Sequence, residues 1–192
     1  MIRRWPPIPT LIVLVAVAIM MRLGFWQIAR LHQKEALLAR YSTSVQQLAP
    51  VPWPDSPEAA RLALYRHSQL VCSRITGITA VSGRNAAGTP GWAHVAICAR
   101  DGGSTRVVLG WSNGPEPVNW SGGSATGVIA PGDATGPRLV ADPPLAGLAA
   151  NATPDPRDIA NNHLSYAVQW FLFAATALVI YAIAARKHLR KS

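Results

Sequence analysis

Charged side chains are scarce in this sequence of 192 residues. Asp, Glu, Lys and Arg together make up only 14% of the chain, whereas hydrophobic residues make up 49%. An ordinary soluble domain has about one quarter charged residues, so the composition excludes that class. The balance indicates a chain that contacts lipid.

Acidic residues are few, and the basic residues are unevenly placed. The nine acidic residues all lie between Glu35 and Asp158, against 18 basic residues in the whole chain. A nucleic-acid-binding protein needs its basic residues clustered on a folded face. Six of them instead stand at the two tips, which favours a membrane protein and no nucleic-acid partner. These six are Arg3, Arg4, Arg186, Lys187, Arg190 and Lys191.

The chain has only two cysteines, Cys72 and Cys98, and no C-x-x-C motif. This excludes a thioredoxin-like or copper-carrying site of that type. Two interpretations stay open, a disulfide between neighbouring strands in an oxidising compartment or two buried thiols. None of the five histidines is paired at a metal-ligand spacing such as H-x-x-x-H, so no metal site is predicted.

Two apolar segments, 8–27 and 164–185, are long enough to cross a bilayer, which needs about 20 residues. The basic tips lie outside both segments, so the positive-inside rule places both termini in the cytoplasm and residues 30–162 on the other side. Arg22 lies near the outer end of the first segment. It either extends its side chain to the interface or contacts a partner subunit or an acidic group within the membrane.

The first apolar segment is expected to stay on the protein as an anchor. It leads into Arg22 and FWQIARLHQ without a small-x-small cleavage site, which a signal peptide would need. Only five residues precede the prolines at its start, too few for an arginine-rich transit peptide. We therefore expect a bacterial inner membrane rather than a mitochondrial one.

The helical pattern continues beyond the first apolar segment to about Tyr41. On this extension Gln27, Arg30 and Lys34 lie within about 60° of one another at 100° per residue, where the helix leaves the headgroups. The polar stripe they form is either a solvated helix face with cations at the headgroups or part of a binding site.

The region between the apolar segments predicts a small antiparallel β domain. Its entry, residues 49–57, has four prolines and cannot be helical. Short β-branched runs follow, with Asp101-Gly102-Gly103 as a hairpin turn, and Asp158, Asn161 or Asn162 is expected to cap the second helix. The expected strands are one or two in 65–83, then 91–100 and 104–112, with shorter ones at 127–130 and 137–140.

The predicted fold class is therefore a pair of membrane helices plus an external small antiparallel β domain, with both termini inside. The expected parts are a tip at 1–7, a first helix at 8–41, the external domain at 42–162, a second helix at 163–185 and a basic tail at 186–192.

One hydrolase-like pattern occurs, because residues 110–114 read G-x-S-x-G around Ser112, with Asp133, Asp142 and His163 following in order. A nucleophile elbow must turn from a strand into a helix, which Pro115 and Pro117 prevent. We expect no enzyme activity from this pattern.

The start of the second apolar segment carries the clearest cluster of candidate site residues. His163, Tyr166 and Trp170 are spaced so that they share one helix face within about 60°. Tyrosine and tryptophan at this depth also form ordinary aromatic belts, which is the competing interpretation.

Three stretches together resemble the surfeit locus protein 1 family. LGFWQIARLHQKEALL resembles its LGxWQxxRxxxK signature, and NNHLSYAVQW resembles its closing NxHLxYxxxW motif. Between them, GTPGWAHVAI and VVLGWSNG resemble its central stretches, although Leu109 stands where the family usually has arginine and Cys98-Ala99 replaces a threonine-proline.

The resemblance implies an inner-membrane factor for the biogenesis of haem-copper cytochrome c oxidase, with the haem-bearing catalytic subunit as partner. It implies haem a as the cofactor handled and His163 as its candidate ligand. Haem a is apolar with two propionates, so Arg30 and Lys34 would pair with the propionates. Trp26, Gln27, Tyr166 and Trp170 complete the matched positions. The alternative is a stoichiometric accessory subunit of the mature oxidase or its supercomplex, without a cofactor.

Overall fold

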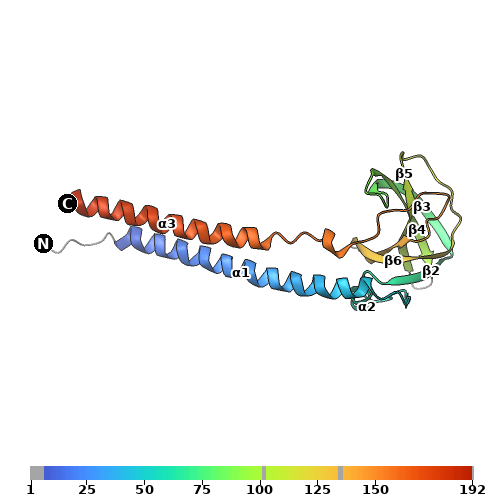
Figure 1. Cartoon of the computed structure of the whole chain (residues 1–192), viewed down its shortest axis with the longest axis horizontal. Helices are drawn as coiled ribbons and strands as arrows, with labels where there is room; N and C mark the ends of the chain where they lie inside the picture. The colour runs from blue at the N-terminus through green and yellow to red at the C-terminus, as the bar shows by residue number, and fades with distance from the viewer. Residues whose placement is uncertain (1–6, 101–102, 134–135, 192) are drawn as a thin grey trace. The chain divides into compact units, whose positions relative to one another are not determined.

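The computed structural model describes residues 7–100, 103–133 and 136–191 (Figure 1). Arg3, Arg4, Asp101 and Gly102, which entered the expectations above, lie outside the described residues. The elements in chain order are α1 (Pro7–Val45), β1 (Val51–Pro52), α2 (Pro57–Ala63), β2 (His67–Cys72), β3 (Arg74–Arg84), β4 (Pro90–Arg100), β5 (Gly103–Ser112), β6 (Gly123–Asp133), β7 (Gly136–Ala141), the 3-10 turn η1 (Pro156–Asp158) and α3 (His163–Lys191).

The chain forms two compact units. One contains Met1–Leu38 and Ile159–Ser192, and the other contains Ala39–Asp158. Within the described residues, α1 and α3 are the two helices whose length and apolar composition would let them cross a membrane. The sequence therefore predicted both candidate spans.

Both long helices extend further than the sequence predicted. α1 ends at Val45 rather than near Tyr41, and α3 continues to Lys191, into the segment expected to be a tail. In the last turns of α1 the hydroxyls of Thr43 and Ser44 donate to the carbonyls of Ala39 and Arg40. These bonds satisfy the polar side chains without breaking the helix.

The β domain is a single mixed sheet, which corrects the prediction of an antiparallel one. Its strand order is β1-β2-β6-β7-β5-β4-β3. β1 runs parallel to β2, and β7 runs parallel to β5, whereas the other pairs are antiparallel. The cause is the segment 113–122, which leads from β5 to β6 and leaves a position open between these two strands. The chain then turns back from β6, and β7 fills that position beside β5.

The expected strands are present, and residues 65–83 give two of them, β2 and β3. Arg100 pairs with Gly103 at the expected β4–β5 hairpin. The sequence did not predict α2, whose start is set by Ser56. The Ser56 side chain accepts from the Ala59 amide at 3.1 Å, and Pro57 occupies the first helical turn.

The main core of the β domain lies on one face of the sheet and contains the disulfide. Cys72 on β2 and Cys98 on β4 are bonded, with their Cα atoms 5.4 Å apart. These strands are not neighbours in the sheet, so the sheet curls until β2 reaches β4. The buried cluster around the disulfide consists of Leu70, Cys72, Ala96, Cys98, Val107, Leu109, Ala125 and Leu139.

Candidate functional site

The two long helices pack against each other in antiparallel orientation (Figure 1). Thr10 and Tyr181 share a hydrogen bond towards one end of the pair. Further along, the Phe25 and Phe171 rings meet edge to face with centroids 5.4 Å apart. Gly24 lies directly under Phe171, because a Cβ built on Gly24 would stand 2.7 Å from that ring. The glycine therefore permits the close approach of the helices.

A hydrogen bond between the helices fixes His163, the first residue of α3. Its Nδ1 lies 2.7 Å from Oε1 of Gln27 on α1, and both side chains are partly buried. The Tyr166 amide donates to the Asn162 carbonyl at 3.3 Å, so Asn162 occupies the capping position just before the histidine. The structure thus brings together one residue from each of the two terminal motifs.

The Gln27 contact determines which imidazole nitrogen is available. An amide oxygen only accepts hydrogen bonds, so the neutral His163 ring carries its proton on Nδ1. Its Nε2 then keeps a lone pair. Metal-bound histidines are ordinarily oriented by such a bond from the other ring nitrogen. Within the described residues no group of three or more His, Cys, Asp or Glu could hold a metal ion.

The polar stripe on α1 divides in the structure. Gln27 turns towards α3, whereas Arg30 is exposed, lies 5.6 Å from the centroid of the Trp26 ring and donates to Gln33 at 3.0 Å. Lys34 is partly exposed. In the described part of the chain neither cation is hydrogen-bonded to His163. Arg30 and Lys34 are thus placed on the same helix as the histidine's partner, one and two turns further along.

Among the described residues, no hydrogen bond joins His163 to Tyr166 or Trp170. Tyr166 is 51% exposed, and Trp170 packs edge to face on Phe173 with centroids 6.2 Å apart. The helix contact instead uses small side chains, because Ala167 and Ala174 are both 2% exposed. Tyr166 therefore faces away from the α1 contact that buries Ala167.

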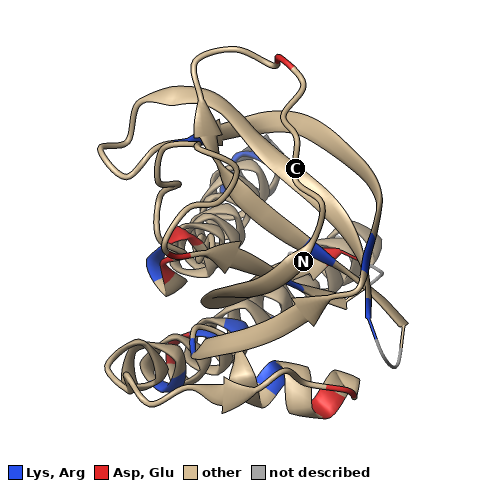
Figure 2. Cartoon of the chain, turned by 90° about the vertical axis from the view of Figure 1, so that its right-hand side faces the viewer, with Lys and Arg blue, Asp and Glu red and all other residues tan. Residues whose placement is uncertain are grey.

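Arg22 is exposed on α1 and borders an open groove of about 390 Å³ with Ile19, Leu23 and Trp26. Figure 2 shows the described basic residues distributed over helices and strands. Among the four described residues that line this groove, Arg22 is the charged one.

Ser112 of the G-x-S-x-G pattern has a structural role. Its hydroxyl donates to the Gly114 carbonyl at 2.6 Å and lies 2.7 Å from Nε2 of His94, which is 1% exposed. Because the serine has one proton and gives it to Gly114, His94 must donate to the serine oxygen. The imidazole is then in the wrong tautomer to act as a base, and no helix follows β5 before β6.

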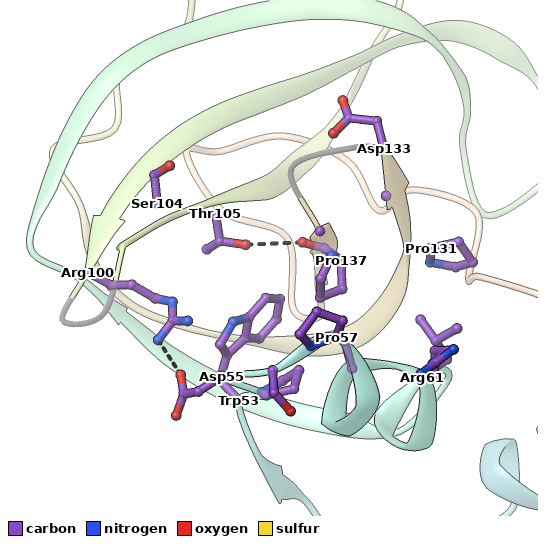
Figure 3. A pocket seen from close by; sticks show the side chains of 16 residues that line it. Trp53, Asp55, Pro57, Arg61, Arg100, Ser104, Thr105, Pro131, Asp133 and Pro137 are labelled. Carbon is purple, nitrogen blue, oxygen red and sulfur yellow. Dashed lines mark hydrogen bonds and ion pairs between the residues drawn. The ribbon is translucent and has the colours of Figure 1, made fainter.

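A separate pocket of about 540 Å³ lies in the β domain (Figure 3). Trp53 forms part of its wall, and Arg100 pairs with Asp55 at 3.0 Å beside the indole. The charged side chains that line it are two arginines and two aspartates, Arg61, Arg100, Asp55 and Asp133. The pocket therefore has no net charge with which to select an anion or a cation.

Sequence reasoning missed three residues that build the helix contact. Gly24, Phe25 and Phe171 lay within or beside the motifs, yet only their packing shows what they do. A small residue within an apolar helix is the signal that marks such a contact.

The chain combines two candidate membrane helices with one mixed β domain. The sequence profile of the SURF1 family matches residues 14–175, which covers most of the chain. The protein therefore belongs to the SURF1 family, whose members are membrane-anchored assembly factors of cytochrome oxidase. A comparison with curated proteins gives no significant match.

Proposed function

We propose that this protein holds haem a as a transient cargo during assembly of haem-copper cytochrome c oxidase, with His163 as the axial ligand. The proposal is supported chiefly by the 2.7 Å contact between His163 Nδ1 and Gln27 Oε1. This contact leaves Nε2 as the nitrogen that would bind the iron of the cargo. The cargo would be passed to the haem-bearing catalytic subunit of the oxidase.

The residues near His163 fit such a cargo chemically. Haem a needs an axial nitrogen, apolar surface for its ring and tail, and cations for its propionates. The aromatic side chains of Phe25, Phe171 and Trp170 supply apolar surface along the same helix pair. Arg30 and Lys34 supply charge on the exposed side of α1, and Trp26 holds the Arg30 guanidinium over its ring. Iron chemistry belongs to the cargo, and these residues bind and orient it.

The location we propose is a bacterial inner membrane, with both termini in the cytoplasm and the β domain in the periplasm. The concentration of basic residues at the two tips supports this orientation. The Cys72–Cys98 disulfide also supports it, because disulfides persist in oxidising compartments.

The ligand proposal is tested by spectra of the full chain purified from cells that make haem a. We expect His163→Ala to abolish the copurifying haem a spectrum. His32→Ala is the matched control, because His32 is an exposed histidine on α1. Gln27→Leu removes the bond that sets the tautomer and should weaken haem binding about 10- to 100-fold, as expected for an outer-shell partner. A His163→Ala protein with unaltered axial features would contradict the proposal.

The transient role is tested against the alternative of a resident accessory subunit. Quantitative mass spectrometry of purified oxidase should find this chain well below one copy per catalytic subunit. A deletion strain should contain an oxidase depleted in haem a while other haem proteins are normal. An equimolar chain in an oxidase of full haem a content would identify it as a resident subunit.

A further inference from the structure

Two arginines lie side by side on the face of the sheet opposite the disulfide core. Arg106 on β5 and Arg138 on β7 are register partners, and Ile97 on β4 is the register partner of Arg106 on the other side. Register partners project from the same face of a sheet. We call Ile97, Arg106 and Arg138 the arginine row. A second row, which we call the valine row, is buried beside it and consists of Val95, Val108 and Val140.

Several nitrogens around the arginine row are buried without a hydrogen-bond partner among the described residues. They are Nε and Nη2 of Arg106, Nε of Arg138 and Nδ2 of Asn151. Buried polar groups in folded proteins are nearly always paired, so each exception needs a reason. All four are donors, and the groups that could pair with them are acceptors of hydrogen bonds.

Two of the residues that carry these donors line the same cavity. Arg138 and Asn151 both border a space of about 140 Å³, together with Ser82 and Arg84. Its remaining walls are mostly apolar and include the valine row. The described residues that line the cavity include no Asp or Glu. The cavity is therefore cationic and lined by donors, and its volume suits one small oxyanion group.

The protein itself offers limited negative charge here. Asp133 forms an ion pair with Nη1 of Arg106. Burial, with the neighbouring Arg106 charge, lowers the pKa of Arg138, and Asp133 offsets part of that effect. Arg138 thus stands in a site that an additional anion would stabilise.

We propose that this cavity binds the carboxylate of an acidic side chain on a partner protein. The guanidinium fork of Arg138 matches a carboxylate, and the Asn151 amide supplies a further donor. Val81 and Ile97 on the same side of the sheet are each 41% exposed, and they give the partner segment an apolar contact next to the charge. An acidic residue flanked by apolar ones is the complementary pattern.

The competing explanation is that the arginines only cover the valine row with their aliphatic stems. Arg138→Met distinguishes the two, because it keeps an unbranched stem of similar reach and removes the charge. Arg138→Lys keeps the charge and removes the fork. Arg74→Met is the matched control, since Arg74 is an exposed arginine on β3 that does not line the cavity.

The probe is a synthetic nine-residue peptide of valine and threonine with one central glutamate and both ends capped. Its binding to the full chain in phosphatidylcholine nanodiscs is measured by fluorescence anisotropy. We expect the glutamate peptide to bind at least about tenfold more tightly than its glutamine analogue, and Arg138→Met to remove that preference. Arg74→Met should leave the preference unchanged. Arg138→Lys should show a preference between that of the unmodified protein and that of Arg138→Met.

A second variant keeps the test independent of any folding defect in Arg138→Met. Asn151→Asp places a carboxylate of the chain itself in the cavity, so it should block the glutamate peptide while raising the melting temperature. Equal binding of the glutamate and glutamine peptides, or no binding of either at about 1 mM, would overturn the proposal. It would also be overturned if inorganic phosphate bound the cavity and the peptide did not, since the site would then take a free oxyanion.

Discussion

Tyr65 shows how single residues in the β domain depend on their surroundings. It is 3% exposed, adopts a φ of 66°, and its ring lies 4.9 Å from that of Tyr41, centroid to centroid. Burial raises its pKa above the ordinary value of 10.0, with smaller contributions from Tyr41, Asp158 and Asp155. A non-glycine residue with positive φ persists only where its environment holds it in place.

The raised pKa of Tyr65 predicts a loss of stability in alkali. The folded state holds the phenol proton more tightly than the unfolded state, so this contribution is complete below pH 10.0 and declines as pH rises through the folded pKa. We expect Tyr65→Phe to flatten the fall in melting temperature above that pH. Tyr166→Phe, at an exposed tyrosine, should keep the slope of the unmodified protein, and an equal slope in Tyr65→Phe would contradict the assignment.

At the scale of elements, the α1–α3 contact depends on the missing side chain of Gly24. We predict that Gly24→Val forces the helices apart, because its Cβ would stand 2.7 Å from the Phe171 ring. The separation is measured by the yield of cross-linking between Gln27→Cys and His163→Cys with a short bismaleimide. We expect this yield to fall in the Gly24→Val background.

The same cross-link separates a steric effect from a general one. Adding Phe171→Ala to Gly24→Val removes the clashing ring and should restore part of the yield. Ala29→Val places the same β-branched residue at an exposed position of α1 and should leave the yield unchanged. A similar loss from both valine variants would show that helix propensity, not packing, is responsible.

The disulfide is the second feature that acts at the scale of elements, because it joins β2 to β4. It joins residues 26 apart, so the chain-entropy estimate of its stabilisation is about 3 to 4 kcal/mol. We expect the Cys72→Ser, Cys98→Ser double variant to lower the free energy of unfolding of the β domain by about this amount. Urea unfolding followed by tryptophan fluorescence measures it, and an unchanged midpoint would contradict a stabilising role.

Local signals in the sequence predicted much of the fold. Apolar length gave the two helices, and β-branched runs bounded by glycine gave the strands of the sheet. The parallel placement of β7 beside β5 was not predictable, because strand order depends on contacts between distant segments. The short helix α2 was not predicted, because its Ser56 cap lies within a proline-rich stretch.

The sequence predicted individual residues of the candidate site better than it predicted how those residues are arranged. Motif resemblance singled out His163 and Gln27, and the structure places them in contact. Helical angles alone grouped Tyr166 with His163, but which face of α3 meets α1 depends on Ala167, Ala174 and Phe171. The unpartnered donors at Arg106, Arg138 and Asn151 have no signature in sequence, because burial creates them.

For the whole molecule, the distribution of charge predicts the orientation in the membrane. With basic residues concentrated at both tips, an alkaline phosphatase fusion at the C-terminus should be inactive. A fusion after Gly88, in the turn between β3 and β4, should be active because it would lie in the periplasm. The reverse pattern would place the β domain in the cytoplasm and contradict the orientation.

The position of the disulfide also determines how the chain can be divided. Cys72, at the end of β2, and Cys98, within β4, lie on either side of the β3–β4 turn, which includes the exposed Gly88. Cleavage of the backbone in that turn yields two fragments, one bearing α1 and one bearing α3. The bond between the cysteines would keep those fragments in one covalent molecule until a reductant breaks it. After reduction, only noncovalent contacts would hold the two fragments together, among them the pairing of β2 with β6 and of β3 with β4 and the contacts between α1 and α3.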